Sequence, residues 1–234
     1  MKLGISIDTF IDYLSHLETP DEMSLNMYKG NTLGAEVRRE QLRFYLEAMR
    51  ENNPSKLFVG EAPGRNGCLQ SGVPFTDLYT LYNNQHPFFF NGLKEHLDEV
   101  IGEEAMETLR YSPARESTST IVWERLQNIQ ITNYPLLWNI YPFHPSTVSS
   151  GYLLPADRPN RHPSTEECRL GIQVLEALLD CFDIKQIYAV GRISEKWLNS
   201  GFPDVQYIRH PSMGGASQFK ATFSSIFQIE DVIL

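Results

Sequence analysis

Three short peptides supply the groups in this sequence that could bind and act on a ligand. The first is the Gly-Glu-Ala-Pro-Gly run at residues 60–64, the second contains Asn139, and the third begins with His210. Glycine and proline favour a sharp turn, and such a turn can point backbone N–H groups at an anion. The carboxamide of Asn139 offers an acceptor beside a donor, and Glu61 and His210 are titratable. These residue types are those of a site for a polar ligand.

Each of the three peptides follows or ends an apolar run that predicts a buried strand. Helical patterns separate these runs, so strands and helices alternate along the chain. The alternation predicts an α/β fold with three αβα layers around a central, mostly parallel four-stranded sheet. The expected strands are residues 57–59, 136–140, 186–190 and 205–208, and the expected helices include 35–51, 194–199, 216–227 and one from 165. Open α/β sheets bind ligands at the carboxyl edge, so the three peptides should meet there.

Three further segments surround the predicted sheet. Residues 1–34 predict an N-terminal arm with a short helix, and residues 80–130 predict a helical insertion. Residues 145–163 are rich in proline and polar residues, which predicts a long loop that could act as a lid or binding loop. No repeat or linker is evident, so we expect a single domain over residues 1–234.

Composition narrows the class of protein. The 234 residues are 41% hydrophobic, enough for a sizeable core, and the net charge of −9 argues against a generic nucleic-acid coat protein. Three widely spaced cysteines predict neither a disulfide framework nor a zinc site, and they fit a reducing cytoplasm. The sequence has no signal-peptide pattern and no run of 18 apolar residues, so we expect no membrane partner.

Taken together and in order, the three peptides resemble the active-site motifs of the uracil-DNA glycosylase superfamily. Gly-Glu-Ala-Pro-Gly at 60–64, followed by Gly-Val-Pro-Phe at 72–75, is similar to the family 4 branch, and the resemblance covers about residues 56–223. Singly, each motif also fits a structural role. The turn could be an ordinary βα turn, Phe75 a core aromatic, Asn139 a satisfied core residue, and His-Pro-Ser a capped strand.

The resemblance implies a DNA repair glycosylase that flips uracil or a related deaminated base out of DNA and hydrolyses its N-glycosidic bond. It implies that Phe75 stacks on the base, Asn139 reads its N3–H and O4 edge, and His210 donates to O2 as charge gathers there. Glu61 is the first choice for positioning the water, and Glu116 is the second. The base-binding turn would consist of Gly60, Ala62, Pro63 and Gly64.

The resemblance also implies a DNA-binding surface, although the overall charge is acidic, because phosphate affinity depends on local cations. Met213 would wedge into the duplex, while Ser212, Gly214 and Gly215 would approach the backbone. The candidate phosphate-binding cations are Arg65, Arg158, Arg161, Arg209 and Lys220. His144 could line the base pocket or only cap a loop. The expected partner is single- or double-stranded DNA, and the expected state is a monomer.

The sequence departs from the family pattern at several positions. Family 4 enzymes bind an iron–sulfur cluster through four cysteines, whereas Phe143 takes one of those positions here, so we expect no cofactor and no metal. Ala62 stands where the best-known branch has the aspartate that positions water. Gly64 replaces the tyrosine that blocks the thymine methyl in that branch, which leaves room near C5 of a pyrimidine.

Two alternatives remain open at the level of sequence. The acidic charge and the alanine at the aspartate position also fit a non-catalytic nucleic-acid or nucleotide binder on the same fold. An unrelated α/β enzyme acting on a small phosphate ester is a further alternative, but the sequence contains no P-loop, no G-x-G-x-x-G and no G-x-S-x-G.

Overall fold

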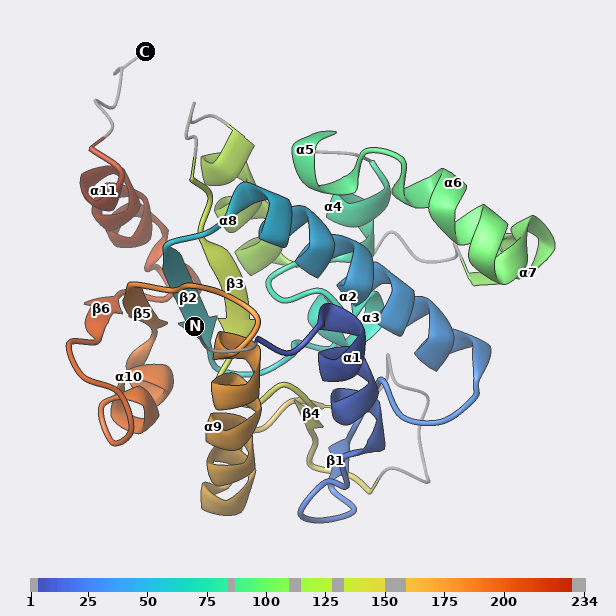
Figure 1. The fold of residues 1–234 in the computed structure, drawn as a ribbon. Coiled ribbons are helices and arrows are strands. Elements are labelled where there is room, and N and C mark those ends of the chain that lie inside the picture. Colours follow the sequence, from blue (N-terminus) through green and yellow to red (C-terminus); the bar gives the residue numbers. More distant parts are fainter. Residues whose placement is uncertain (1–3, 84–86, 110–114, 128–132, 150–158, 229–234) are drawn as a thin grey trace.

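The computed structural model of the protein describes residues 4–83, 87–109, 115–127, 133–149 and 159–228. A four-stranded, wholly parallel sheet forms its centre, with strand order β3-β2-β5-β6 (Figure 1). The strands are β2 Lys56–Gly60, β3 Leu136–Asn139, β5 Gln186–Val190 and β6 Gln206–Ile208. All four agree with the runs expected from the sequence, because apolar segments of this length between turn residues suit central parallel strands.

Helices cover both faces of the sheet. Phe58 on β2 packs against Phe223 of α11 (Ala216–Ile226), with ring centroids 5.7 Å apart. The neighbouring register position faces the other way, and there Trp138 of β3 packs against Phe10 of α1 (Ile7–His16) at 5.6 Å. The two helices lie on opposite sides of the sheet (Figure 1), which confirms the three-layer αβα architecture.

The remaining helices pack around these layers. They are α2 Leu33–Asn52, α3 Cys68–Ser71, α4 Leu78–Tyr82, α5 Pro87–Phe90, α6 Leu93–Leu97, a π-helical turn Asp98–Gly102, α7 Glu103–Leu109, α8 Ser117–Gln127, α9 Thr165–Leu179 and α10 Arg192–Leu198. Local signals explain where several of them begin and end. Ser164 forms a capping box with Glu167 at the start of α9, and Asn53 ends α2 in the left-handed conformation, with φ of 50°.

Close packing fixes α9 against the end of β3. Gly171 lies against the carbonyl of Ile140 so tightly that a Cβ at this position would overlap it. Helix α9 is therefore in direct contact with the segment that follows β3, and this contact fixes the position of that segment.

The N-terminal segment is more deeply built into the fold than an arm would be. The face of α1 that contains Ile7, Phe10 and Leu14 is fully buried. The same segment supplies β1 (Ser24–Leu25), which pairs antiparallel with β4 (His144–Pro145) in a second, two-stranded sheet that the sequence did not predict. This small sheet holds the chain just after β3.

Candidate active site

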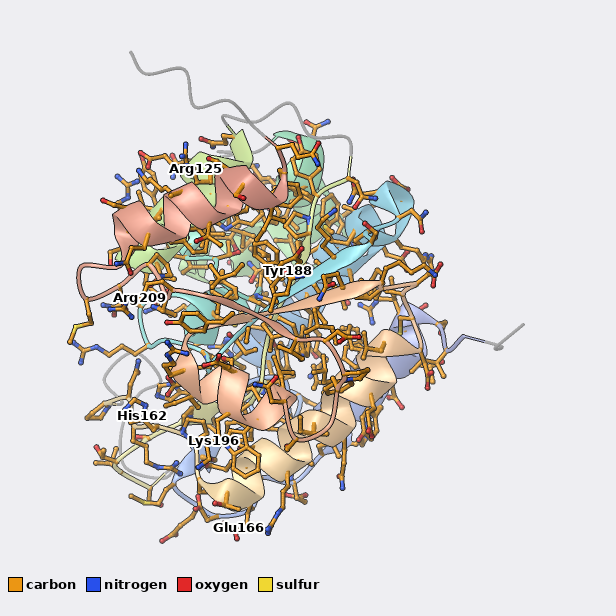
Figure 2. The ribbon with its side chains drawn as sticks, turned by 90° about the vertical axis from the view of Figure 1, so that its left-hand side faces the viewer. Arg125, His162, Glu166, Tyr188, Lys196 and Arg209 are labelled. Carbon is orange, nitrogen blue, oxygen red and sulfur yellow. The ribbon has the colours of Figure 1, made fainter. Side chains whose placement is uncertain are left out.

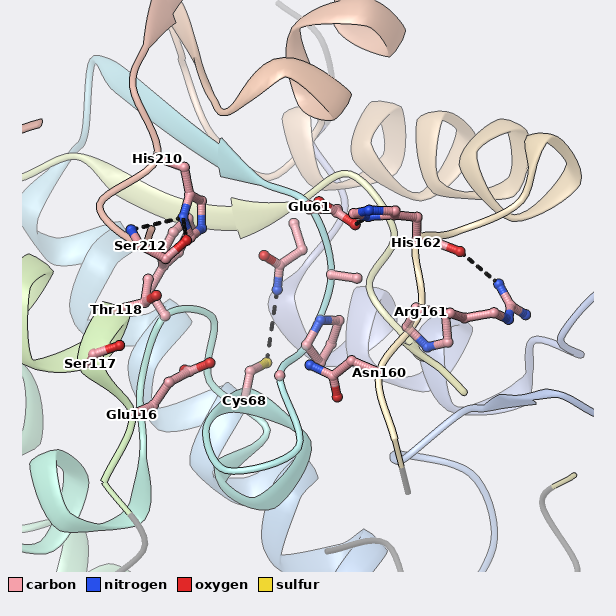
Figure 3. A pocket seen from close by; sticks show the side chains of 16 residues that line it. Glu61, Cys68, Glu116, Ser117, Thr118, Asn160, Arg161, His162, His210 and Ser212 are labelled. Carbon is pink, nitrogen blue, oxygen red and sulfur yellow. Dashed lines mark hydrogen bonds and ion pairs between the residues drawn. The ribbon is translucent and has the colours of Figure 1, made fainter. Parts of the chain in front are cut away.

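A cleft of about 590 Å³ opens at the carboxyl edge of the parallel sheet (Figure 3). Three strand ends contribute to it, through the turn after β2, the end of β3 and the loop after β6. The lining residues are Glu61, Ala62, Pro63, Gly64, Cys68, Phe75, Glu116, Ser117, Thr118, Asn139, Pro145, Asn160, Arg161, His162, His210 and Ser212. The structure thus brings Phe75, Asn139 and His210 around one cavity.

Backbone pairing between β2 and β3 continues into the site. The N–H of Ile140 donates to the carbonyl of Gly60 at 2.8 Å, and the N–H of Tyr141 donates to the carbonyl of Glu61 at 3.1 Å. A Cβ at Gly60 would overlap the Phe75 ring and lie 2.8 Å from Asn139 Oδ1. Glycine is therefore required here to let the aromatic ring and the carboxamide approach the strand end.

Phe75 is held in an uncommon backbone conformation. Its φ is 57°, in the left-handed region that bulky residues rarely adopt, and its side chain is 6% exposed. The indole Nε1 of Trp123 on α8 donates to the Phe75 carbonyl at 3.2 Å. Strained residues of this kind persist where the surroundings over-determine them, often at functional sites. The helical segment around α8 thus helps to position the ring at the cleft.

Asn139 lies on the cleft wall with its carboxamide largely uncommitted. Within the described part of the chain, its only contact in hydrogen-bond range is the weak one from Nδ2 to Cys68 Sγ, at 3.9 Å. The residue is 5% exposed, so a ligand that enters the cleft would find an almost dry donor and acceptor side by side.

His210 has a defined tautomer. The backbone N–H of Ser212 donates to His210 Nδ1 at 3.2 Å, and Ser212 Oγ lies 2.7 Å from the same nitrogen (Figure 3). Because Nδ1 accepts, the proton of the neutral ring must be on Nε2, which leaves an N–H donor for the cleft. Burial, aided by Arg209, lowers the pKa of His210 to about 4. The imidazole is therefore neutral at physiological pH.

Glu61 meets a partner that the sequence analysis did not select. His162 Nδ1 lies 2.6 Å from Glu61 Oε1, on the side of the cleft opposite His210 in the view of Figure 3. The His162 side chain is largely exposed, whereas the Glu61 side chain is about one-third exposed. The contact orients the Glu61 carboxylate at the edge of the cavity. Ala62 also lines the cleft and offers only a methyl group.

A second carboxyl group, that of Glu116, lines the cleft near Cys68. It lies against Gly64 and Gly67 so closely that a Cβ at either position would overlap its oxygens. Burial, followed by the neighbouring Asp77, raises the pKa of Glu116 to about 7. Asp77 is fully buried and accepts from the Glu116 backbone N–H at 2.7 Å, which fixes the residue just before α8.

The loop after β6 extends beyond the cleft. Met213 is 91% exposed, with φ of 53°, and it is flanked by Gly214, with φ of 78°. A Cβ at Gly215 would overlap the His210 carbonyl. Arg209 donates from Nη2 to the Met213 carbonyl at 3.3 Å and lies near the edge of the molecule, on the same side as His162 (Figure 2). The loop therefore presents an apolar tip beside a cation.

Two of the expected phosphate-binding cations are committed elsewhere. Arg161 donates from both terminal nitrogens to Glu167, at 2.6 and 2.7 Å, and from Nε to the Ser146 carbonyl at 2.8 Å. Its guanidinium is thus part of the cleft wall and is already paired with a carboxylate there. Lys220 is paired with Glu124 at 3.0 Å. Arg65 is exposed, and Arg158 lies outside the described residues.

His144 does not line the cleft. It is fully buried in β4, and its Nδ1 lies 2.8 Å from the Pro63 carbonyl, so it stabilises the turn at residues 60–64 through the backbone. The alternative that it binds substrate directly does not fit this position. Gly60 likewise serves the site by its small size and is not a lining residue.

Several lining residues were not selected from the sequence. They are Cys68, Ser117, Thr118, Pro145, Asn160 and His162. The Asn-Arg-His-Pro peptide at 160–163 lies at the end of the proline-rich segment that was predicted as a long loop, but nothing in its spacing links it to Glu61. In the structure, a hydrogen bond links this peptide to the turn after β2, where the Arg65 N–H donates to Asn160 Oδ1 at 3.2 Å.

The residues present do not fit an iron–sulfur cluster. Such clusters need four thiolate ligands, and the chain has only three cysteines, all of them free. Phe143, at the position of one family 4 ligand, is fully buried and packs edge-on against Tyr141. In the described ranges, no three His, Cys, Asp or Glu side chains gather as a metal site would require. Among the described helices, none is both long and apolar enough to cross a membrane.

Comparisons with known proteins identify the family and the fold. The family model of the uracil DNA glycosylase superfamily matches residues 48–228. The crystal structure of wild-type SMUG2 from Pedobacter heparinus is similar, with a TM-score of 0.60 and 17% identity over 95% of this chain and 96% of that chain. At this identity the likeness concerns the fold alone, and no curated protein matches the sequence. Because the family model covers most of the chain, the protein belongs to the uracil DNA glycosylase superfamily.

Proposed function

We propose that this protein is a monofunctional DNA glycosylase that releases uracil or a related deaminated base from DNA. The observation that supports this most strongly is the convergence of Phe75, Asn139 and His210 on one cleft. An aromatic face, a carboxamide and a neutral imidazole donor together suit a flat lactam ring. Membership of the superfamily supports the same reaction class and DNA as the partner.

In the proposed complex the base leaves the duplex and enters the cleft. Phe75 stacks on its face, a contact worth about 1–3 kcal/mol per base. Asn139 Oδ1 accepts from N3–H, and Nδ2 donates to O4. Cytosine presents an acceptor and an amino group instead, so the same carboxamide mismatches it. Met213 occupies the space that the base leaves in the stack.

Bond cleavage places negative charge on the base. The bond from C1′ to the base nitrogen breaks with its electron pair going to the base, and the sugar passes through an oxocarbenium-like state. The His210 Nε2–H donates to O2, where the charge gathers, and it needs no proton transfer because the ring is already neutral. A preorganised donor of this kind is worth about 3–4 kcal/mol of barrier.

Water completes the reaction at C1′. The Glu61 carboxylate, oriented by His162 at 2.6 Å, binds the water and takes its proton as the oxygen bonds to carbon. The product sugar keeps the hydroxyl. The base anion takes up a proton from solvent, and Glu61 releases the proton it accepted to solvent. Glu116 is less suited to this role, because its pKa of about 7 leaves it partly protonated at neutral pH.

The test is base release from a panel of oligonucleotides. Single- and double-stranded substrates with uracil, hypoxanthine, xanthine or cytosine are incubated with protein, and abasic sites are cleaved with alkali. We expect release of at least one deaminated base and no release of cytosine. DNA affinity without release of any base, unchanged in His210→Ala, would instead indicate a non-catalytic nucleic-acid binder.

A further inference from the structure

The turn at Gly64 does not leave open space, because a second residue fills it. A Cβ on Gly64 would overlap the Glu116 carboxyl oxygens, and the same holds for Gly67. The Glu116 carboxyl therefore occupies the volume that a side chain on this turn would take. It comes from the segment just before α8, within the predicted insertion at 80–130.

The orientation of Asn139 indicates which edge of the base faces this carboxyl. Asn139 Oδ1 lies next to Gly60, while Nδ2 points to Cys68 Sγ at 3.9 Å. If Oδ1 accepts from N3–H and Nδ2 donates to O4, as in the proposed function, the O4 side of the ring faces Cys68. On a pyrimidine, C5 is the ring atom beyond C4 on that side.

Glu116 lies beside Cys68 on that same side. The two side chains lie next to one another in Figure 3. Burial raises the pKa of the Cys68 thiol, and the Glu116 carboxylate raises it further, so the two groups are close enough to interact. The order along the cleft wall is thus Asn139, Cys68, Glu116, and a C5 substituent would point toward the last of these.

We propose that Glu116 is a specificity-determining residue, whose carboxyl group excludes bases with a methyl group at C5. The proposal rests on the proposed function and names the group that tells uracil from thymine at this site. In the described part of the chain, no hydrogen bond satisfies the Glu116 carboxyl oxygens. They therefore face the cleft.

The physical basis is steric and polar together. Uracil has only a hydrogen at C5, so it leaves the Glu116 carboxyl oxygens open to the cleft. A thymine methyl would take up the space beside these oxygens and cover them with an apolar group, which is unfavourable for a largely buried polar group. A single methyl group in a fitted pocket changes discrimination by about 10–200-fold.

The experiment compares uracil with thymine in matched DNA duplexes opposite guanine. Wild type, Glu116→Gln, Glu116→Ala and Glu116→Ser are measured, with Glu107→Ala as a control, since Glu107 is exposed on α7 far along the chain from the turn. Base release is one readout. The other is affinity for duplexes with 2′-fluoroarabino uridine or its 5-methyl counterpart, in which fluorine slows cleavage.

The expected result is a change of ratio. Glu116→Ala and Glu116→Ser should raise the thymine-to-uracil ratio by about 10-fold or more, while Glu116→Gln, which keeps the volume, and Glu107→Ala stay close to wild type. An unchanged ratio in both smaller variants would overturn the proposal. So would a wild type without preference, or loss of uracil release and uridine affinity in the smaller variants.

The two readouts separate this inference from the proposed function. If wild type releases no base, the proposed function fails, yet the affinity ratio still decides whether Glu116 excludes the methyl group. If wild type releases uracil and the ratio is insensitive to residue 116, only the present inference fails.

Discussion

Glu61 and His162 meet at 2.6 Å at the edge of the cleft, although 101 positions separate them in the chain. Glu61 follows a central strand, whereas His162 belongs to the peptide before α9. A hydrogen bond between the Arg65 backbone and Asn160 holds these two segments together. The pair joins the one carboxylate suited to water activation to a side chain that fixes its direction.

This contact predicts that the two residues act as a unit. Glu61→Gln should slow single-turnover uracil release by about 10²-fold, as expected for loss of a general base. His162→Ala should slow it by about 10-fold, because the carboxylate remains but loses its orienting partner. The double variant should resemble Glu61→Gln alone, and fully additive losses would contradict the coupling. His16→Ala, an exposed histidine on α1, is the matched control.

Phe75 provides a second prediction, on binding. Phe75→Leu keeps an apolar side chain but removes the aromatic face, so affinity for DNA with an uncleavable uracil nucleotide should fall by about 1–3 kcal/mol. Phe75→Tyr should stay close to wild type. Fluorescence anisotropy measures both, and equal affinities for all three proteins would show that the ring does not stack on the base.

The exposed Met213 side chain predicts a difference between DNA strands. Met213→Ala removes the apolar tip that would replace a flipped base, so release from duplex DNA should fall several-fold, about 1–2 kcal/mol in barrier. Single-stranded DNA has no base stack for the side chain to fill, so the rate of base release from single strands should change little. Met213→Leu is the control that keeps an apolar tip. Equal losses on both substrates would exclude a wedge role.

The lowered pKa of His210 predicts a pH dependence of stability. The pKa of His210 in the native state, about 4, lies below the ordinary histidine value of 6.5, so the unfolded chain binds more protons between these two pH values. This contribution to stability is complete above pH 6.5 and is lost as pH falls toward 4. It amounts to about 1–3 kcal/mol.

Urea unfolding at pH 7.5 and pH 5 measures this effect. Because Glu116, with its pKa raised to about 7, shifts stability in the opposite direction, the comparison is wild type against His210→Asn at each pH. His210→Asn should lose less stability on acidification than wild type. An identical loss in both proteins would show that His210 is not held neutral by the fold.

The sequence was sufficient to predict the sheet and three of its strand ends. Apolar runs bounded by glycine or proline located β2, β3, β5 and β6, and parallel pairing then required Gly60, Asn139 and the His210 loop to share one edge. The strand patterns are local in the sequence, and parallel pairing leaves only one edge at which the carboxyl ends of the strands can meet. Both could therefore be predicted without knowledge of side-chain contacts.

Contacts between distant segments were beyond reach of the sequence. Arg161 was expected to contact DNA, but it pairs with Glu167 in the structure. The sequence could not show this pairing, because the partner of a charged side chain is set only by the fold. The segment at 80–130 was expected as an insertion, yet Trp123 holds Phe75 and Glu116 enters the cleft. Both depend on tertiary packing rather than on local pattern.

The account depends most directly on a neutral His210 that donates to the departing base. Single-turnover release of uracil from a labelled oligonucleotide at pH 7.5 tests it, with wild type, His210→Ala and His16→Ala compared. We expect release by wild type and His16→Ala, and a rate about 10²–10³-fold lower for His210→Ala. Equal rates for wild type and His210→Ala, or no release of uracil by wild type, would contradict the account.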